Sequence, residues 1–185
     1  MIDDVKKDAA QRMTKSVAIL KGQFRKLRTG RAHTSLLEHV TVDYYGSEVP
    51  ISQAATVSVE DSRTLAVAPW EKQMVAMVEK AILTSDLGLT PVTAGTVIRV
   101  PLPPMTEERR KELVKVVRHE TEAGRIAVRN IRRDAIADVK ELLKEKLVTQ
   151  DEDHRAHDEI QKLTDEAIAE METVLQKKET EIMDF

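Results

Sequence analysis

Three long stretches of the chain repeat their apolar residues at steps of three or four and contain no proline. They cover about residues 2–27, 106–146 and 150–182. This spacing predicts amphipathic helices, and at 1.5 Å per residue the second would be ~60 Å long. Because a helix with a single apolar stripe must bury it against another element, we expect the three to pack as an elongated three-helix bundle.

Local signals mark the expected ends of these helices. Gly30 is expected to end the first, because glycine adopts the left-handed conformation without steric cost. Thr106 is expected to cap the second, whose first turn is acidic and so favours the positive end of the helix dipole. Residues 149–152 (Thr-Gln-Asp-Glu) fit a capping box at the start of the third.

The rows of apolar residues predict which side of each helix faces the interior. In the first helix the row is Ile2, Val5, Ala9, Met13, Val17, Leu20, Phe24 and Leu27. In the second it is Ala123, Ala127, Ile131, Ala135, Val139 and Leu143. In the last it is Ala156, Ile160, Leu163, Ala167, Met171, Val174 and Ile182.

Residues 31–103 have a different pattern, with short β-branched runs and one amphipathic segment. We expect strands near 40–45, 49–51, 55–59, 64–68 and 95–100, and a helix over 71–83. The predicted fold class is therefore α+β: residues 31–103 form a small β/α/β domain inserted into a bundle built from 1–30 and 104–185. The chain crosses this junction twice, and its expected hinge residues are Gly30, Ala32, Pro101, Pro103 and Pro104.

The net charge is only −3, but the charges are segregated along the chain. Residues 1–31 hold 9 bases and 3 acids (+6), and residues 106–147 hold 12 and 9 (+3). Residues 32–105 hold 4 bases and 8 acids (−4), and residues 148–185 hold 4 and 12 (−8). Such segregation creates local fields that the total conceals, so a polyanionic partner is compatible with this composition.

The strongest candidate site is a basic stripe on the second long helix, which falls within an arc of about 100° opposite the apolar row. The stripe comprises Lys111, Lys115, Arg118, Arg125, Arg129, Arg132, Arg133 and Lys140. We expect it to face solvent and its arginines at 125, 129, 132 and 133 to contact an RNA backbone, because guanidinium groups suit bidentate phosphate contacts. The alternative is an ordinary solvated face with salt bridges to the acidic last helix.

A second candidate lies at residues 25–31, where Arg28, Gly30 and Arg31 would expose positive charge at one end of the bundle. The alternative is a helix C-terminus whose cations simply complement the dipole.

Several other classes of function are disfavoured. Without cysteine there is no disulfide framework, thiolate metal cluster or cysteine nucleophile. Apolar runs reach about five residues against ~20 for a membrane span, and no secretory signal is readable, so we expect a cytosolic protein. His154 and His157, near Asp151, Asp153 and Asp158, could bind a metal, but solvated side chains are the preferred interpretation. We find no phosphate-binding glycine loop and no acid–base or nucleophile motif, and we expect no catalytic residue and no cofactor.

The chain also resembles a known family, the bacterial ribosome recycling factors, through motifs that run in register over its whole length. The resemblance rests on residues 27–32 (LRTGRA), 42–46 (VDYYG), 59–65 (VEDSRTL), 85–89 (SDLGL), 98–104 (IRVPLPP), 106–111 (TEERRK), 128–134 (VRNIRRD) and 161–165 (QKLTD). It implies an L-shaped, two-domain monomer that binds the A site of post-termination ribosomes. It further implies that the bundle lies against large-subunit ribosomal RNA and that elongation factor G with GTP drives subunit separation. In the family pattern Arg132, with Arg129 beside it, matches the key RNA-contacting arginine, and Arg28, Gly30 and Arg31 match the tip motif.

Two other interpretations remain at this point. The bundle could be a helical adaptor or chaperone whose arginines only confer solubility. A small enzyme built on the inserted domain is disfavoured by the lack of a nucleophile–base arrangement.

Overall fold

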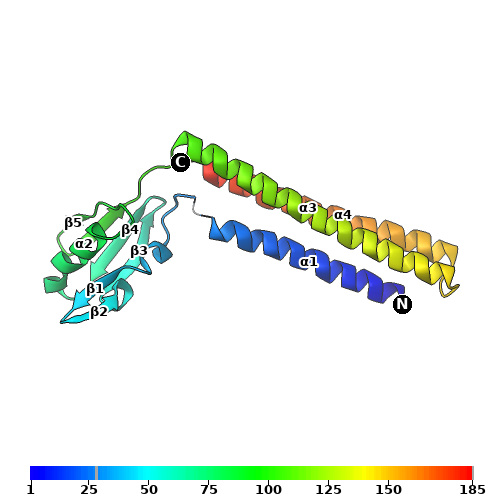
Figure 1. Cartoon of the computed structure of the whole chain (residues 1–185), viewed down its shortest axis with the longest axis horizontal. Helices are drawn as coiled ribbons and strands as arrows, with labels where there is room; N and C mark the ends of the chain where they lie inside the picture. The colour runs from blue at the N-terminus through cyan, green and yellow to red at the C-terminus, as the bar shows by residue number, and fades with distance from the viewer. Residues whose placement is uncertain (28, 185) are drawn as a thin grey trace. The chain divides into compact units, whose positions relative to one another are not determined.

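The computed structural model describes residues 1–27 and 29–184, and the chain divides into two compact units. One unit combines Met1–Arg28 with Thr106–Asp184, and the other is Thr29–Met105. The first is helical, and the second carries all the strands of the described residues (Figure 1). The expected α+β class, long helices with a small β domain, is confirmed.

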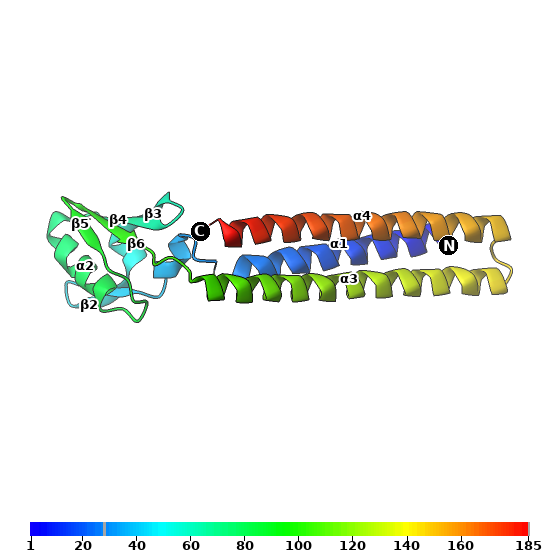
Figure 2. The ribbon, with the colours of Figure 1, turned by 90° about the horizontal axis from the view of Figure 1, so that it is seen from above.

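The helical unit consists of α1 (Ile2–Lys26), α3 (Glu107–Lys144) and α4 (Gln150–Met183). The three helices lie side by side, and each contacts the other two. α3 runs antiparallel to α1 and α4 (Figure 2). Among residues 1–27 and 29–184, no helix combines the length and the apolar character that crossing a membrane requires.

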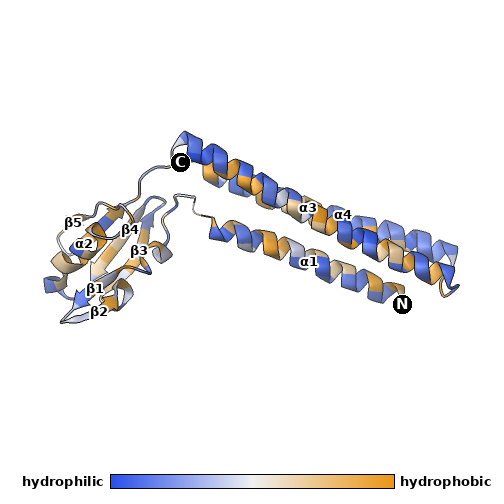
Figure 3. Cartoon of the chain, viewed as in Figure 1, coloured by the Kyte–Doolittle hydropathy of each residue, from blue (hydrophilic) through white to orange (hydrophobic). Residues whose placement is uncertain are grey.

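The core of this unit is an apolar seam along the three helices (Figure 3). From α1 it buries Ala9, Met13, Val17, Leu20 and Phe24. From α3 it buries Leu113, Val117, Thr121, Val128, Ile131, Ala135 and Val139. From α4 it buries Ala156, Ile160, Thr164, Ala167, Met171, Leu175 and Ile182. The two buried threonines satisfy their hydroxyls within the helix, because Thr121 donates to the carbonyl of Val117 (2.7 Å) and Thr164 to that of Ile160 (2.9 Å).

The predicted interior row of α3 is wrong at its first two positions, since Ala123 and Ala127 are exposed. Four residues advance an α-helix by slightly more than one turn, so a row of constant four-residue steps drifts by about 40° per step around the helix. The buried row instead breaks its four-residue steps with a step of seven from Thr121 to Val128 and a step of three from Val128 to Ile131, which cancels this drift. A smaller error affects α4, where Thr164 and Leu175 are buried and their predicted neighbours Leu163 and Val174 are only half-buried.

The predicted helix starts are confirmed, whereas the predicted end of α1 is wrong. Thr106 accepts a hydrogen bond from the backbone N–H of Arg109 (3.1 Å). Thr149 and Glu152 form the reciprocal capping box (Glu152 N–H to Thr149 Oγ1, 3.2 Å; Thr149 N–H to Glu152 Oε2, 2.7 Å). α1 ends at Lys26 with Leu27 in an extended conformation, so Gly30, although its φ is +80°, lies beyond the helix end.

The second unit contains a four-stranded antiparallel sheet in the order β3-β4-β6-β5 and a separate β1–β2 hairpin. The strands are β1 (Thr41–Tyr44), β2 (Ser47–Pro50), β3 (Ala55–Asp61), β4 (Thr64–Pro69), β5 (Val92–Ala94) and β6 (Val97–Pro101). One α-helix, α2 (Val75–Leu83), and short 3₁₀ turns at Thr34–Leu37, Ile51–Gln53 and Lys72–Met74 complete the unit.

The core of this second unit follows from the two-residue period of its central strands. Leu65 and Val67 of β4 and Ile98 and Val100 of β6 are fully buried, and the residues between them are more exposed. α2 packs on these strands and adds Val78 and Ile82 to the same cluster. The strand β5 is a difference from the sequence prediction: it has only three residues, too few for an alternating pattern to indicate a strand.

Candidate nucleic-acid interface

The basic stripe lies on α3, and its members differ in exposure more than the sequence predicts. Lys111, Lys115 and Lys140 are exposed, as are Arg118, Arg129 and Arg133, whereas Arg132 is half-buried. Arg125 departs from the expected solvent-facing position, because only 18% of its side chain is exposed. The physical reason is the adjacent α4, whose Glu172 accepts a hydrogen bond from Arg125 and holds the guanidinium against the interface.

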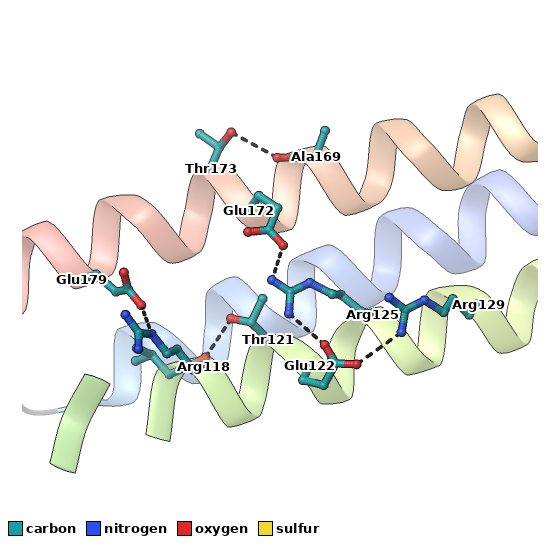
Figure 4. Close-up of polar contacts among 10 residues, drawn as sticks. Arg118, Thr121, Glu122, Arg125, Arg129, Ala169, Glu172, Thr173 and Glu179 are labelled. Atoms are coloured by element: carbon teal, nitrogen blue, oxygen red, sulfur yellow. Dashed lines mark hydrogen bonds and ion pairs between the residues drawn. The ribbon is translucent and has the colours of Figure 1, made fainter. Parts of the chain in front are cut away.

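Three arginines of the stripe form ion pairs with carboxylates of the same molecule (Figure 4). Arg118 Nε contacts Glu179 of α4 at 2.6 Å. Arg125 donates to Glu172 of α4 and to Glu122 of its own helix, the latter at 2.8 Å. Arg129 contacts the second oxygen of Glu122 at 3.2 Å.

Glu122 is therefore the acid that links two arginines of the stripe. Hydrogen bonds from Arg125 and then Arg129 lower the pKa of Glu122 below that of an ordinary glutamate. Counted together, Arg118, Arg125 and Arg129 face Glu122, Glu172 and Glu179, so three positive and three negative charges cancel over this part of the helix. The interpretation of the stripe as a face with salt bridges to the last helix is correct for Arg118 and Arg125, whereas Arg129 pairs within its own helix.

The next two arginines have a different environment. Arg132 Nη1 donates to the amide oxygen of Gln161 on α4 (2.7 Å), and Arg133 donates to the amide oxygen of Asn130. Asp134, the acid next in sequence, pairs instead with Arg12 of α1 at 3.3 Å. Within residues 1–27 and 29–184, no carboxylate forms an ion pair with Arg132 or Arg133. Their two positive charges are thus held in place by neutral partners and stay available to an anion.

The neutral partners belong to the candidate site, although the charge pattern of the sequence does not indicate them. Asn130 and Gln161 carry no charge, and Gln161 meets Arg132 only because α4 packs against α3. A weak signal for Asn130 exists in the sequence, since it lies three residues before Arg133 and so on the same helix face. Nothing in local spacing could indicate Gln161.

The second basic site is only partly within the described residues. Arg28 lies outside them, and Arg31 is exposed. Gly30 needs to be glycine for two reasons: its φ of +80° is in the left-handed region, and a Cβ there would come within 3.1 Å of Met105 Cγ.

The predicted hinge residues fall into two groups. Ala32 donates its N–H to the carbonyl of Ser62 (2.9 Å), and Pro101 ends β6, paired with Thr64 of β4. Both are therefore fixed to the sheet unit. Pro103 and Pro104 are exposed and lie in no helix or strand.

The histidine candidates for a metal site do not converge. His157 Nε2 lies 3.4 Å from Asp153 Oδ1, one turn away on α4, and His154 is exposed. In the part of the chain that the structure describes, no three histidine or acidic side chains are grouped so that they could hold a metal ion.

Comparison with known proteins gives one consistent family. The model of the family described as ribosome recycling factor matches residues 20–183. The ribosome-recycling factor of Thioalkalivibrio sulfidiphilus (strain HL-EbGR7) is 62% identical over 184 residues, and that of Legionella pneumophila (strain Paris) is 59% identical over 185 residues. Both matches cover 100% of this chain and of the relative.

Two solved structures have the same fold over nearly the whole chain. A solution structure of the ribosome recycling factor aligns with a TM-score of 0.66 at 43% identity, covering 100% of this chain and 98% of the other. The second is the T. thermophilus ribosome recycling factor, placed with E. coli elongation factor G on the E. coli post-termination complex. It aligns with a TM-score of 0.59 at 46% identity, covering 99% of each chain.

Proposed function

Because the chain belongs to the ribosome recycling factor family, we propose that it binds ribosomes after termination and, with elongation factor G and GTP, separates their subunits for a new round of translation. The solved relative on a post-termination complex with elongation factor G supports this assignment. The proposed site of binding is the A site, where the helical unit contacts large-subunit ribosomal RNA.

The observation that carries the RNA contact is the uncompensated charge at Arg132 and Arg133. Their guanidinium groups are oriented by amide oxygens and not by carboxylates. Binding a phosphate there requires no ion pair to be broken, whereas Arg118 and Arg125 would first have to leave Glu179 and Glu172. We therefore assign the principal RNA contact to Arg132 and Arg133, a flanking role to Arg129, and a mainly structural role to Arg125.

We propose a different role for each of the two units. The bundle, residues 1–30 with 104–185, is the RNA-binding domain, and Arg28, Gly30 and Arg31, where the chain passes into the inserted domain, form a second contact. The inserted domain, residues 31–103, is the moving part and meets the elongation factor or the small subunit. Since Ala32 and Pro101 are hydrogen-bonded or paired within the sheet unit, the hinge is proposed to bend at the segments around Gly30 and Pro103–Pro104.

In this proposal the chain is a cytoplasmic translation factor that catalyses no reaction and needs no cofactor of its own. It acts as a monomer that contributes shape and positive charge, while GTP hydrolysis by the partner supplies the free energy for splitting. Its affinity for ribosomes should fall with rising salt, because each phosphate contact releases condensed counterions.

The test is a splitting assay. Post-termination ribosomes are mixed with the protein, elongation factor G and GTP, and dissociation into subunits is followed by light scattering. We expect splitting only when all components are present, and pelleting with ribosomes that weakens as salt rises. Salt-insensitive binding to unfolded polypeptide without splitting would instead support the adaptor or chaperone interpretation.

A further inference from the structure

A chain of two hydrogen bonds connects α3 and α4 at Arg132. Arg132 Nη1 donates to Gln161 Oε1 (2.7 Å), and Gln161 Nε2 donates to Asp165 Oδ1 (2.8 Å) one turn further along α4. Asp165 thereby fixes which end of the amide faces Arg132. With the amide reversed, its NH₂ group would face the guanidinium and its carbonyl would face the carboxylate, and both contacts would be repulsive.

The identity of this partner has a direct electrostatic consequence. At the corresponding α3–α4 contacts of Arg118 and Arg125, α4 supplies the carboxylates Glu179 and Glu172. A carboxylate would hold an arginine more tightly, but it would also cancel the charge and compete with a phosphate for the same N–H groups. An amide oxygen orients the guanidinium and leaves its charge intact.

We propose that Gln161 is a positioning residue for the RNA contact of Arg132: it pre-orients the guanidinium across the α3–α4 interface without neutralising it. This inference rests on the proposed function, since it takes an RNA phosphate as the ligand of Arg132. Holding a long arginine side chain in one geometry before binding reduces the ordering cost that binding must otherwise meet. Arg132 is half-buried and its Nε–H is buried without a partner among the described residues, so a phosphate contact falls to the Nη N–H groups that Gln161 does not take.

The experiment compares two substitutions that add the same charge to the same helix. Gln161→Glu places a carboxylate beside Arg132, whereas Gln176→Glu adds one at an exposed position of α4. Affinity for purified 70S ribosomes is measured by pelleting at graded salt, and folding is checked by thermal melting followed by circular dichroism. Gln161→Ala is measured alone and in the Arg132→Ala background.

We expect Gln161→Glu to weaken ribosome binding roughly tenfold or more, as Arg132→Ala does, and to reduce the magnitude of the salt slope by about one. Gln176→Glu should stay close to the wild type in both measurements. Gln161→Ala should weaken binding in the wild-type background and have no further effect once Arg132 is absent, because coupled residues are non-additive.

The inference is overturned if Gln161→Glu binds like Gln176→Glu, or if Gln161→Ala weakens binding equally with and without Arg132. The Gln161→Ala cycle decides the matter should Gln161→Glu fail to fold. Failure of the proposed function is distinguishable, because then the wild type would not bind ribosomes, or Arg132→Ala would bind as the wild type does.

Discussion

A Cβ added to Gly124 of α3 would lie 3.2 Å from the Sδ and Cε atoms of Met171, which is fully buried on α4. The missing side chain at Gly124 thus lets α3 and α4 approach closely in the middle of the bundle. The same two helices carry the contacts between the arginines of α3 and the acidic and amide side chains of α4.

The two mid-helix glycines of the bundle should respond differently to the same substitution. Gly22→Ala meets no atom within 4 Å, so it should stabilise the protein by about 0.5–1 kcal/mol through helix propensity. Gly124→Ala should be less stable than Gly22→Ala by about 1 kcal/mol or more, because its methyl group must displace Met171. Urea unfolding followed by the helical circular dichroism signal measures both, and equal gains would contradict the close approach.

Arg125 and Arg132 should separate folding from ribosome binding. Arg125→Ala leaves Glu122 and Glu172 without their shared partner, so it should cost about 1–3 kcal/mol of unfolding free energy. Ribosome affinity per folded molecule should change little. Arg132→Ala should cost less stability and weaken ribosome binding about tenfold or more. Melting and pelleting measured in parallel check this, and the reverse pattern would place the RNA contact at Arg125.

The contacts of Glu122 predict that part of the unfolding free energy of the bundle is lost at acid pH. The pKa of Glu122 is lowered by hydrogen bonds from Arg125 and Arg129, so the folded state binds fewer protons at this residue than the unfolded state. The stabilisation is therefore complete above the unfolded pKa of about 4.5 and is lost as pH falls through the folded pKa. The difference in melting temperature between the wild type and Glu122→Gln should be largest at neutral pH and shrink below about pH 4.5. A difference that is constant with pH would show that the carboxylate charge contributes nothing.

Both tyrosines of the chain donate hydrogen bonds to the same carboxylate, Glu71 of the second unit. Tyr44 donates to Glu71 at 2.7 Å, and Tyr45 donates to the other oxygen of the same carboxylate. These hydrogen bonds raise the pKa of Tyr44 and of Tyr45. The resulting stabilisation is present below the unfolded pKa of about 10 and is lost as pH rises through the folded values.

Absorbance at tyrosinate wavelengths tests this contact, because the chain has no tyrosine elsewhere. Glu71→Ala should shift ionisation of both tyrosines to lower pH than in the wild type. Glu79→Ala, which removes a carboxylate that accepts from Thr93 in the same unit, is the matched control and should leave the titration unchanged. Identical curves for all three proteins would refute the contact.

Much of the fold was predictable because it depends on interactions that are local in sequence. The caps at Thr106 and Thr149 are formed within three residues, and both were predicted correctly. The central strands β4 and β6 also follow from local alternation, since every second side chain of a strand lies on the same face. The end of α1 was not predictable from Gly30 alone, because the extended conformation of Leu27 ends the helix earlier.

The sequence by itself determined the long helices, their starting caps, the apolar segments of the sheet and the concentration of arginine on α3. Only the tertiary structure decided which arginines pair with a carboxylate and which do not. Arg125 and Arg132 lie on the same helix and have the same chemistry, but packing of α4 gives one a carboxylate from Glu172 and the other an amide from Gln161. The physical reason is that a helical period describes one helix in isolation, whereas the net charge offered to a ligand depends on the side chains that the neighbouring helix places opposite it.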